Sequence, residues 1–105
     1  MLRIHDVMLD ALRTMRPAIA AIQRNDPDLA RQLRRAASSV ALNLAEGSGS
    51  AGGVRRARYL TALGSARETL SCLQVGEALG YVEAIPENVL ARLHRVIGTL
   101  VHVTA

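Results

Sequence analysis

The sequence predicts an all-α fold: an antiparallel, up-down-up-down four-helix bundle that occupies residues 1–105 as a single domain and is oligomeric. Half of the 105 residues are hydrophobic, which is enough to bury one modest core but not two. The chain has no Phe or Trp and only two Tyr, so the aromatic enrichment that is typical of strands is missing. Apolar residues instead recur at steps of three and four, which is the period of a helix with one buried face.

The first helix is expected over residues 4–22. Pro17 interrupts its apolar pattern, and a proline inside a helix costs about 3 kcal/mol. We therefore expect either a kink at this position or a helix in two pieces. The apolar residues on its inner face are Ile4, Met8, Ala11, Leu12, Met15, Ile19 and Ile22.

The second helix carries clear start and stop signals. Asp26 is suited to the N-cap and Pro27 to the first helical position. Gly47 is placed to end the helix in a left-handed conformation. The inner stripe is expected to contain Leu29, Leu33, Ala36, Ala37, Val40 and Leu44.

The third helix is expected from about Val54 to Leu79, with Gly80 as its C-cap. Pro86 introduces the fourth helix, and the short connection makes the two helices antiparallel neighbours. The inner faces comprise Tyr59, Leu63, Ala66, Leu70 and Leu73 of the third helix and Val89, Leu93, Val96, Ile97, Leu100 and Val103 of the fourth.

A few apolar residues are expected to face away from the core. Leu42 lies on the outer side of the second helix, and Val75 and Leu79 lie with Cys72 on a second face of the third. Apolar residues that face outward indicate contact with another subunit. We therefore expect a homo-oligomer whose interface includes Leu42, Val75 and Leu79.

The glycine-rich segment 47–53 contains a formal GxGxxG match at Gly47, Gly49 and Gly52. A dinucleotide-binding fingerprint needs a preceding strand and a βαβ unit, and this segment follows a helix instead. We expect a flexible connection between helices and no cofactor.

No residue pattern indicates an enzyme, a metal site or a membrane protein. The single Cys72 permits neither an intramolecular disulfide nor Cys-rich zinc spacing, and the three histidines form no recognisable ligand motif. No apolar run approaches the roughly 20 residues that a bilayer requires. We expect no catalytic residues and a cytoplasmic protein without a secretory signal.

Two motifs resemble a known family signature. The first runs from LRRA at residues 33–36 to NLAEG at residues 43–47, and the second is ALGSARE at residues 62–68, followed by LGY at residues 79–81. In this order they resemble the four-helix-bundle proteins encoded by intervening sequences in bacterial 23S rRNA genes. The accessory variability determinant of diversity-generating retroelements is related to that family. The resemblance implies a homopentamer, RNA or DNA as a partner, and a protein partner such as a reverse transcriptase.

Four polar residues of these motifs have two interpretations. Asn43, Glu46, Arg67 and Glu68 lie beside the inner stripes of the second and third helices. The favoured interpretation is a buried polar network that fixes helix register, because buried polar groups need partners. The alternative, a catalytic acid and base, requires a pocket and a carboxylate with a perturbed pKa.

Charge favours an acidic partner. All thirteen basic residues are Arg, the formal net charge is +4, and the pI is near 10.6. The absence of Lys is explained equally well by codon bias in a GC-rich genome. Two clusters stand out, one at the start of the second helix and one after the glycine segment, and antiparallel packing separates them by about 20–30 Å. They are Arg31, Arg34 and Arg35, and Arg55, Arg56 and Arg58.

These clusters suit a phosphate backbone, although a solvated Arg face explains them equally well. The leading hypothesis is therefore a non-catalytic nucleic-acid-associated or scaffold protein. The alternative is a structural or protein-interaction module without affinity for nucleic acid.

Overall fold

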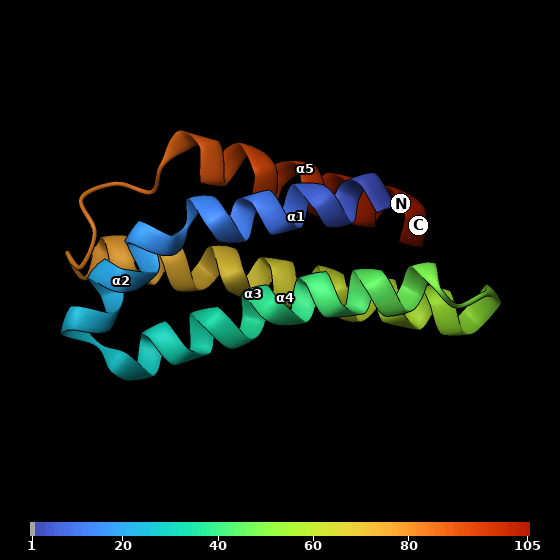
Figure 1. The fold of residues 1–105 in the computed structure, drawn as a ribbon, viewed down its shortest axis with the longest axis horizontal. Coiled ribbons are helices and arrows are strands. Elements are labelled where there is room, and N and C mark those ends of the chain that lie inside the picture. Colours follow the sequence, from blue (N-terminus) through green and yellow to red (C-terminus); the bar gives the residue numbers. More distant parts are fainter. Residues whose placement is uncertain (1) are drawn as a thin grey trace.

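The computed structural model describes residues 2–105, and their side chains from Arg3 onward. This part of the chain is all-α, as predicted, and contains no strand. It forms an elongated body of 42 × 24 × 20 Å. Five helices follow one another: α1 (Leu2–Thr14), α2 (Arg16–Asn25), α3 (Pro27–Ser48), α4 (Gly52–Ala78) and α5 (Glu87–Thr104) (Figure 1).

The long helices lie side by side along the long axis (Figure 1). α3 packs against α4 on one side and against α1 and α2 on the other, while α5 packs against α4 and α1. Successive long helices run in opposite directions, and both ends of the chain lie at the same end of the molecule. The predicted antiparallel pairing of the last two helices is confirmed.

The predicted first helix is broken in two, which gives five helices where four were expected. Pro17 lies in the first turn of α2, and Met15 takes φ −89° and ψ 0° at the break. A proline has no N–H to donate to the preceding turn, so the break falls where a hydrogen bond is lost. Met15 itself is fully buried and keeps both pieces on the core.

The start of α3 is as predicted, but its end is not. The Asp26 carboxylate accepts the Leu29 N–H at 3.0 Å, and Pro27 follows as the first helical residue. Gly47 does not end the helix in a left-handed conformation, because α3 continues to Ser48 and positive φ occurs, among the described residues, only at Gly52 and Gly80. Gly47 is buried, and a Cβ there would overlap the ring of Tyr59. It therefore serves close packing of α3 on α4.

α4 ends at Ala78, one residue before the predicted end, and the chain turns as predicted at Gly80, which has φ +80°. The Tyr81 N–H bonds the Gly76 carbonyl at 2.9 Å and the Gly80 N–H bonds the Glu77 carbonyl at 3.0 Å. These two bonds form a Schellman motif. In α5 the expected burial of Val103 is wrong: this side chain is exposed, and Thr104 is buried one position later. Four residues separate Thr104 from buried Leu100, so it falls on the inner face instead.

The core consists of Leu, Val, Ile, Met and Ala side chains with Tyr59 and Cys72. Many of the buried residues are alanines, which permit close approach of the helices. None of the described helices combines the length and hydropathy needed to cross a membrane.

Candidate nucleic-acid interface

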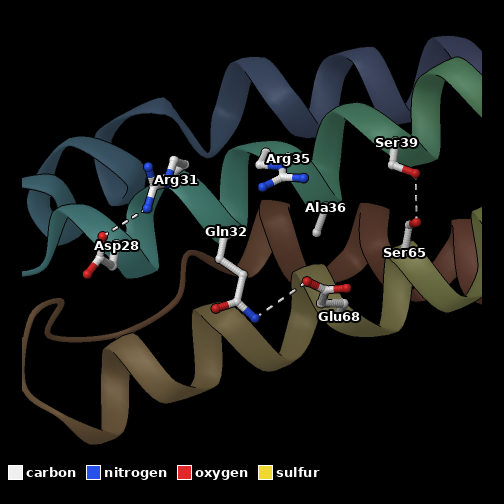
Figure 2. A pocket seen from close by; sticks show the side chains of 8 residues that line it. All are labelled: Asp28, Arg31, Gln32, Arg35, Ala36, Ser39, Ser65 and Glu68. Atoms are coloured by element: carbon white, nitrogen blue, oxygen red, sulfur yellow. Dashed lines mark hydrogen bonds and ion pairs between the residues drawn. The ribbon is translucent and has the colours of Figure 1, made fainter.

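A polar groove opens between α3 and α4 (Figure 2). Its volume is about 560 Å³. The small side chains of Ala36, Ser39 and Ser65 lie where the two helices face each other, so the longer side chains around them leave a hollow. The complete lining is Asp28, Arg31, Gln32, Arg35, Ala36, Ser39, Ser65 and Glu68.

The groove contains few hydrogen bonds, and all but the partly buried Ser39–Ser65 bond are exposed. Arg31 Nη2 lies 3.1 Å from Asp28 Oδ1, with 67% and 89% of the two side chains exposed. Gln32 Nε2 donates to Glu68 Oε2 at 3.5 Å, and the hydroxyls of Ser39 and Ser65 are 2.8 Å apart. Exposed ion pairs contribute little to stability and exchange readily. These groups are therefore available to a ligand.

Two further hollows continue this groove across α3. The second is lined by Arg34, Arg35, Ser38, Ser39, Leu42 and Asn43, and the third by Leu12, Arg13, Arg16, Ile19, Arg34 and Ser38. Because Arg35 lines the first two hollows and Arg34 lines the last two, the three adjoin one another. We call the shared surface the α3 arginine face. Its guanidinium groups belong to Arg13, Arg16, Arg31, Arg34 and Arg35.

The sequence pattern indicates only part of this face. Arg31, Arg34 and Arg35 were predicted to bind nucleic acid, but Arg13 and Arg16 were missed. These two residues flank the break between α1 and α2, where they lie beside α3. The signal available in the sequence was Pro17, which marks the break that brings them there.

All five arginines of the face are exposed. Arg13 Nη1 is 2.7 Å from Asp10 Oδ1, and Arg34 Nη1 donates to Gln23 Oε1 at 3.0 Å. Each of these contacts is between exposed side chains. The face therefore presents charged guanidinium groups to solvent.

The second predicted cluster has a different environment. Arg55 Nε donates to the Gly47 carbonyl at 3.2 Å, and Arg56 Nη2 donates to the Thr104 carbonyl at 2.9 Å. These carbonyls belong to the last turns of α3 and α5, where acceptors lack helical partners and cations are favourable. Arg58 Nη2 lies 3.4 Å from Glu46 Oε2. The cluster thus ties helix ends together.

The structure keeps the two clusters apart. Arg55, Arg56 and Arg58 lie in the first turns of α4, next to the loop, whereas Arg31, Arg34 and Arg35 lie in the first half of α3. With antiparallel helices and a rise of 1.5 Å per residue, the separation along the axis is about 20 Å. One subunit does not join them into one surface.

The four polar motif residues do not form one buried network. Asn43 is half-buried and donates to the Ser39 carbonyl at 2.9 Å, while Glu46, Arg67 and Glu68 are exposed. Asn43 Oδ1 also accepts from Arg58 Nη1 at 3.5 Å. Asn43 and Glu46 thus share Arg58, whereas Glu68 contacts Gln32 at the other end of the helix pair. The expected burial of these charges is wrong: Glu46 and Glu68 lie at the edges of the α3–α4 interface, and Arg67 is exposed on α4.

The outward apolar residues lie in two places. Leu42 is 65% exposed and lines the second hollow, within the α3 arginine face. Val75 and Leu79 are also exposed, but they lie near the end of α4 that packs beside α2 and the start of α3. The rise per residue puts them about 20 Å from Leu42 along the axis. They do not form one patch within a subunit.

Cys72 belongs to the core and not to the surface patch expected for it. Burial raises the pKa of its thiol, and the nearby Glu68 carboxylate adds to this effect. A protonated, buried thiol is a poor nucleophile. Among the described residues, no group of three or more His, Cys, Asp or Glu side chains is placed to hold a metal ion.

The sequence matches a known protein family over most of its length. The family model for the 23S rRNA-intervening sequence protein matches residues 11–102, which cover most of the chain. The chain belongs to this family. The matched range includes every residue of the α3 arginine face and ends just before the last residues of α5.

A solved structure shares the fold of this family member. It is the crystal structure of a protein of unknown function from the S23 ribosomal protein family of Bacteroides thetaiotaomicron VPI-5482. The two chains are 15% identical and superpose with a TM-score of 0.80 over 96% of this chain and 97% of the other. No curated protein matches the sequence at a significant level.

Proposed function

We propose that this protein is a non-catalytic nucleic-acid-binding scaffold that contacts the phosphate backbone of RNA or DNA through the α3 arginine face. The observation that carries the proposal is the continuity of this face. Arg34 and Arg35 each line two adjoining hollows, so five guanidinium groups share one surface. The planar, always charged guanidinium group suits phosphate oxygens and pairs with them in a bidentate manner.

We expect this face to contact the charged phosphates of a nucleic acid and not its bases. None of the residues lining the three hollows is aromatic, so the face lacks platforms on which bases stack. Contacts to phosphate oxygens position a nucleic acid without reading its sequence. We therefore expect weak sequence preference and strong dependence on salt.

The proposal includes assembly into a homo-oligomer. Taken together, α1 and α2 act as one helix of a four-helix bundle, and exposed Val75 and Leu79, which lie away from the α3 arginine face, supply apolar contacts between bundles. The resemblance to the family favours a pentamer, in which the arginine face is repeated around a ring. A protein such as a reverse transcriptase is a further partner of such a scaffold.

A second candidate is a protein-interaction module without affinity for nucleic acid. The observation that favours it is Leu42, whose exposed side chain lies among the arginines. An exposed leucine beside basic residues suits an amphipathic acidic protein segment better than a phosphate backbone.

Titration of labelled RNA, single-stranded DNA and duplex DNA with the purified protein separates these candidates. We expect binding at micromolar protein in 50 mM salt, with affinity falling steeply by 200 mM, on the order of 10³-fold or more if six or more phosphates are contacted. Absence of binding to all three nucleic acids at low salt would contradict the proposal and favour the interaction module.

A further inference from the structure

Glu68 is an unexpected residue on a surface that binds phosphate. Its side chain lines the groove between α3 and α4, as do the side chains of Arg31 and Arg35 (Figure 2). Within the described part of the chain no ion pair includes Glu68, whereas the other acid of the groove, Asp28, lies 3.1 Å from Arg31 Nη2. A carboxylate without a cationic partner repels a phosphate beside it. The groove therefore contains one position that suits a different chemical group.

The fold makes little use of the Glu68 carboxylate. Its hydrogen bond from Gln32 Nε2 is 3.5 Å long, beyond the usual range of about 2.7–3.2 Å, and both side chains are exposed. A long, exposed hydrogen bond contributes little net stability and is readily exchanged for one to a ligand. The carboxylate oxygens are thus free to accept hydrogen bonds from a bound molecule.

A hydroxyl donor lies one helical turn from this acceptor. The Ser39 and Ser65 hydroxyls are 2.8 Å apart, and Asn43 Nδ2 donates to Ser39 Oγ at 3.1 Å. The bond between the hydroxyls uses one of their two protons, and no further acceptor in the described part of the chain bonds the other. Either serine can hold this second proton, and both serines line the groove. The groove thus offers a donor and an acceptor close together.

This arrangement is complementary to a third hydroxyl group. Ser65 and Glu68 are three residues apart on α4, so their Cβ atoms lie about 5–6 Å apart on one face of the helix. A hydroxyl between the two side chains can accept from the serine and donate to the carboxylate, with O···O distances of about 2.7–2.8 Å. An ionised phosphate oxygen has no proton to donate. The Glu68 carboxylate therefore favours a hydroxyl over a phosphate.

We propose that this position holds the 2′-hydroxyl of an RNA ribose while Arg35 holds the adjoining phosphate, so that the α3 arginine face prefers RNA to DNA. The 2′-hydroxyl is both a donor and an acceptor, and it lies on the carbon next to the one that carries the 3′ phosphate. Arg35 and Glu68 line one hollow of about 560 Å³, with small Ala36 between them (Figure 2). That volume is within the range in which proteins hold small ligands. Deoxyribose offers the carboxylate no donor.

A contact to the ribose distinguishes RNA from DNA without reading sequence, because every ribonucleotide carries the same sugar. The preference for RNA rests on the proposed binding of phosphate by the α3 arginine face, but it can fail while that binding holds. Equal affinity for RNA and DNA, with the expected dependence on salt, would overturn only the preference. Absence of binding to every nucleic acid would overturn both.

Three duplexes of one sequence test the hydroxyl directly: RNA, DNA, and RNA with 2′-fluoro groups in place of the hydroxyls. Fluorine has no proton to donate, and the 2′-fluoro duplex keeps the A-form geometry of RNA. Fluorescence anisotropy measures the affinities at about 50 mM salt, with EDTA present so that no divalent cation links the carboxylate to phosphate. We expect RNA to bind about tenfold more tightly than either other duplex, the scale of one hydrogen bond to a charged group.

Glu68→Gln tests whether this carboxylate recognises the hydroxyl. The variant loses the negative charge, so we expect its binding to DNA to strengthen and its preference for RNA to fall to about threefold or less. Glu83→Gln removes the same charge from an exposed position that lines none of the three hollows, and it is expected to keep the preference. Ser65→Ala is expected to reduce the preference and to leave binding to DNA unchanged. Circular dichroism verifies that all three variants remain helical.

Two further results would overturn the proposal. If the 2′-fluoro duplex binds as tightly as RNA, the protein recognises A-form geometry and not the hydroxyl. If Glu68→Gln keeps the full preference of the unmodified protein for RNA, the ribose contact lies outside this groove.

Discussion

The two ends of the α3–α4 pair differ in how they use the same residue types. At the loop end Gly47 of α3 leaves room for the ring of Tyr59 on α4, so the two helices pack closely. Arg55 donates to the carbonyl of Gly47. Toward the other end a groove runs from Ser39 and Ser65, in the middle of the pair, to Asp28, and the arginines beside it face solvent. An arginine thus stabilises the fold where the carbonyls of a helix end lie within reach, and remains available for binding where they do not.

The two ends of the α3–α4 pair therefore differ in role: the loop end contributes to stability, and the groove is the proposed place of binding. The cluster of Arg55, Arg56 and Arg58 bonds the ends of neighbouring helices, whereas the α3 arginine face is the surface proposed to bind nucleic acid. Substitutions at the loop end should therefore lower the free energy of unfolding, and substitutions in the groove should leave it nearly unchanged.

The largest effect on stability is expected from Gly47→Ala. The added Cβ overlaps the buried ring of Tyr59, and overpacking of this kind costs about 1–3 kcal/mol. Urea denaturation measures the loss. Gly98→Ala is the matched control, because a Cβ there meets nothing within 4 Å and alanine should stabilise α5 by roughly 0.5–1 kcal/mol. Equal stability of the two variants would show that the loop end is not tightly packed.

A smaller loss is expected from Arg56→Gln. The variant loses the charged donor to the Thr104 carbonyl, and a cation at a helix C-terminus contributes about 0.3–1 kcal/mol. For a domain of this size that corresponds to a Tm lower by roughly 1–8 °C. Arg95→Gln removes the same charge from an exposed position on α5 and is the control. If both variants melt at the same temperature, the bond to Thr104 contributes nothing.

The smallest effect is expected from Gln32→Ala in the groove. Its hydrogen bond to Glu68 is long, at 3.5 Å, and exposed, so the free energy of unfolding should change by less than about 0.5 kcal/mol. Thermal unfolding monitored by circular dichroism measures this change. A loss as large as that of Gly47→Ala would mean that the groove is part of the stabilising core.

Much of this fold could be predicted from the helical spacing of apolar residues and from the residues that start, break or end helices. Pro17, Asp26 and Gly80 act locally on the backbone, so their effects on helix boundaries are legible in the sequence. Gly47 was predicted to end α3, but it is required because the ring of Tyr59 on α4 packs directly against it. Such a contact between two helices is not visible in the sequence. Val103 and Thr104 lie three and four residues after buried Leu100, and both spacings fit the inner face of a helix. Only the packing shows that Thr104, and not Val103, is the buried one.

The candidate site was less predictable for the same reason. Sequence clustering marked Arg55 and Arg56 as equivalent to Arg34 and Arg35, because it cannot show which carbonyls lie nearby. It also missed Arg13 and Arg16, which join the face only through the break between α1 and α2 and the packing of both helices on α3. Distances across the fold, and not spacing along the chain, define the surface.

The central claim is that the α3 arginine face binds phosphate, and the salt dependence of binding tests it most directly. The slope of log K against log salt should be measured for duplex DNA with the unmodified protein and two triple variants that lose equal charge. One is Arg31→Gln, Arg34→Gln and Arg35→Gln, and the control is Arg3→Gln, Arg92→Gln and Arg95→Gln on α1 and α5. We expect the first to reduce the slope by about 2–3 and the control to leave it nearly unchanged, since each lost phosphate contact reduces it by about 0.9. Equal slopes for the two triple variants would contradict the assignment of binding to the α3 arginine face.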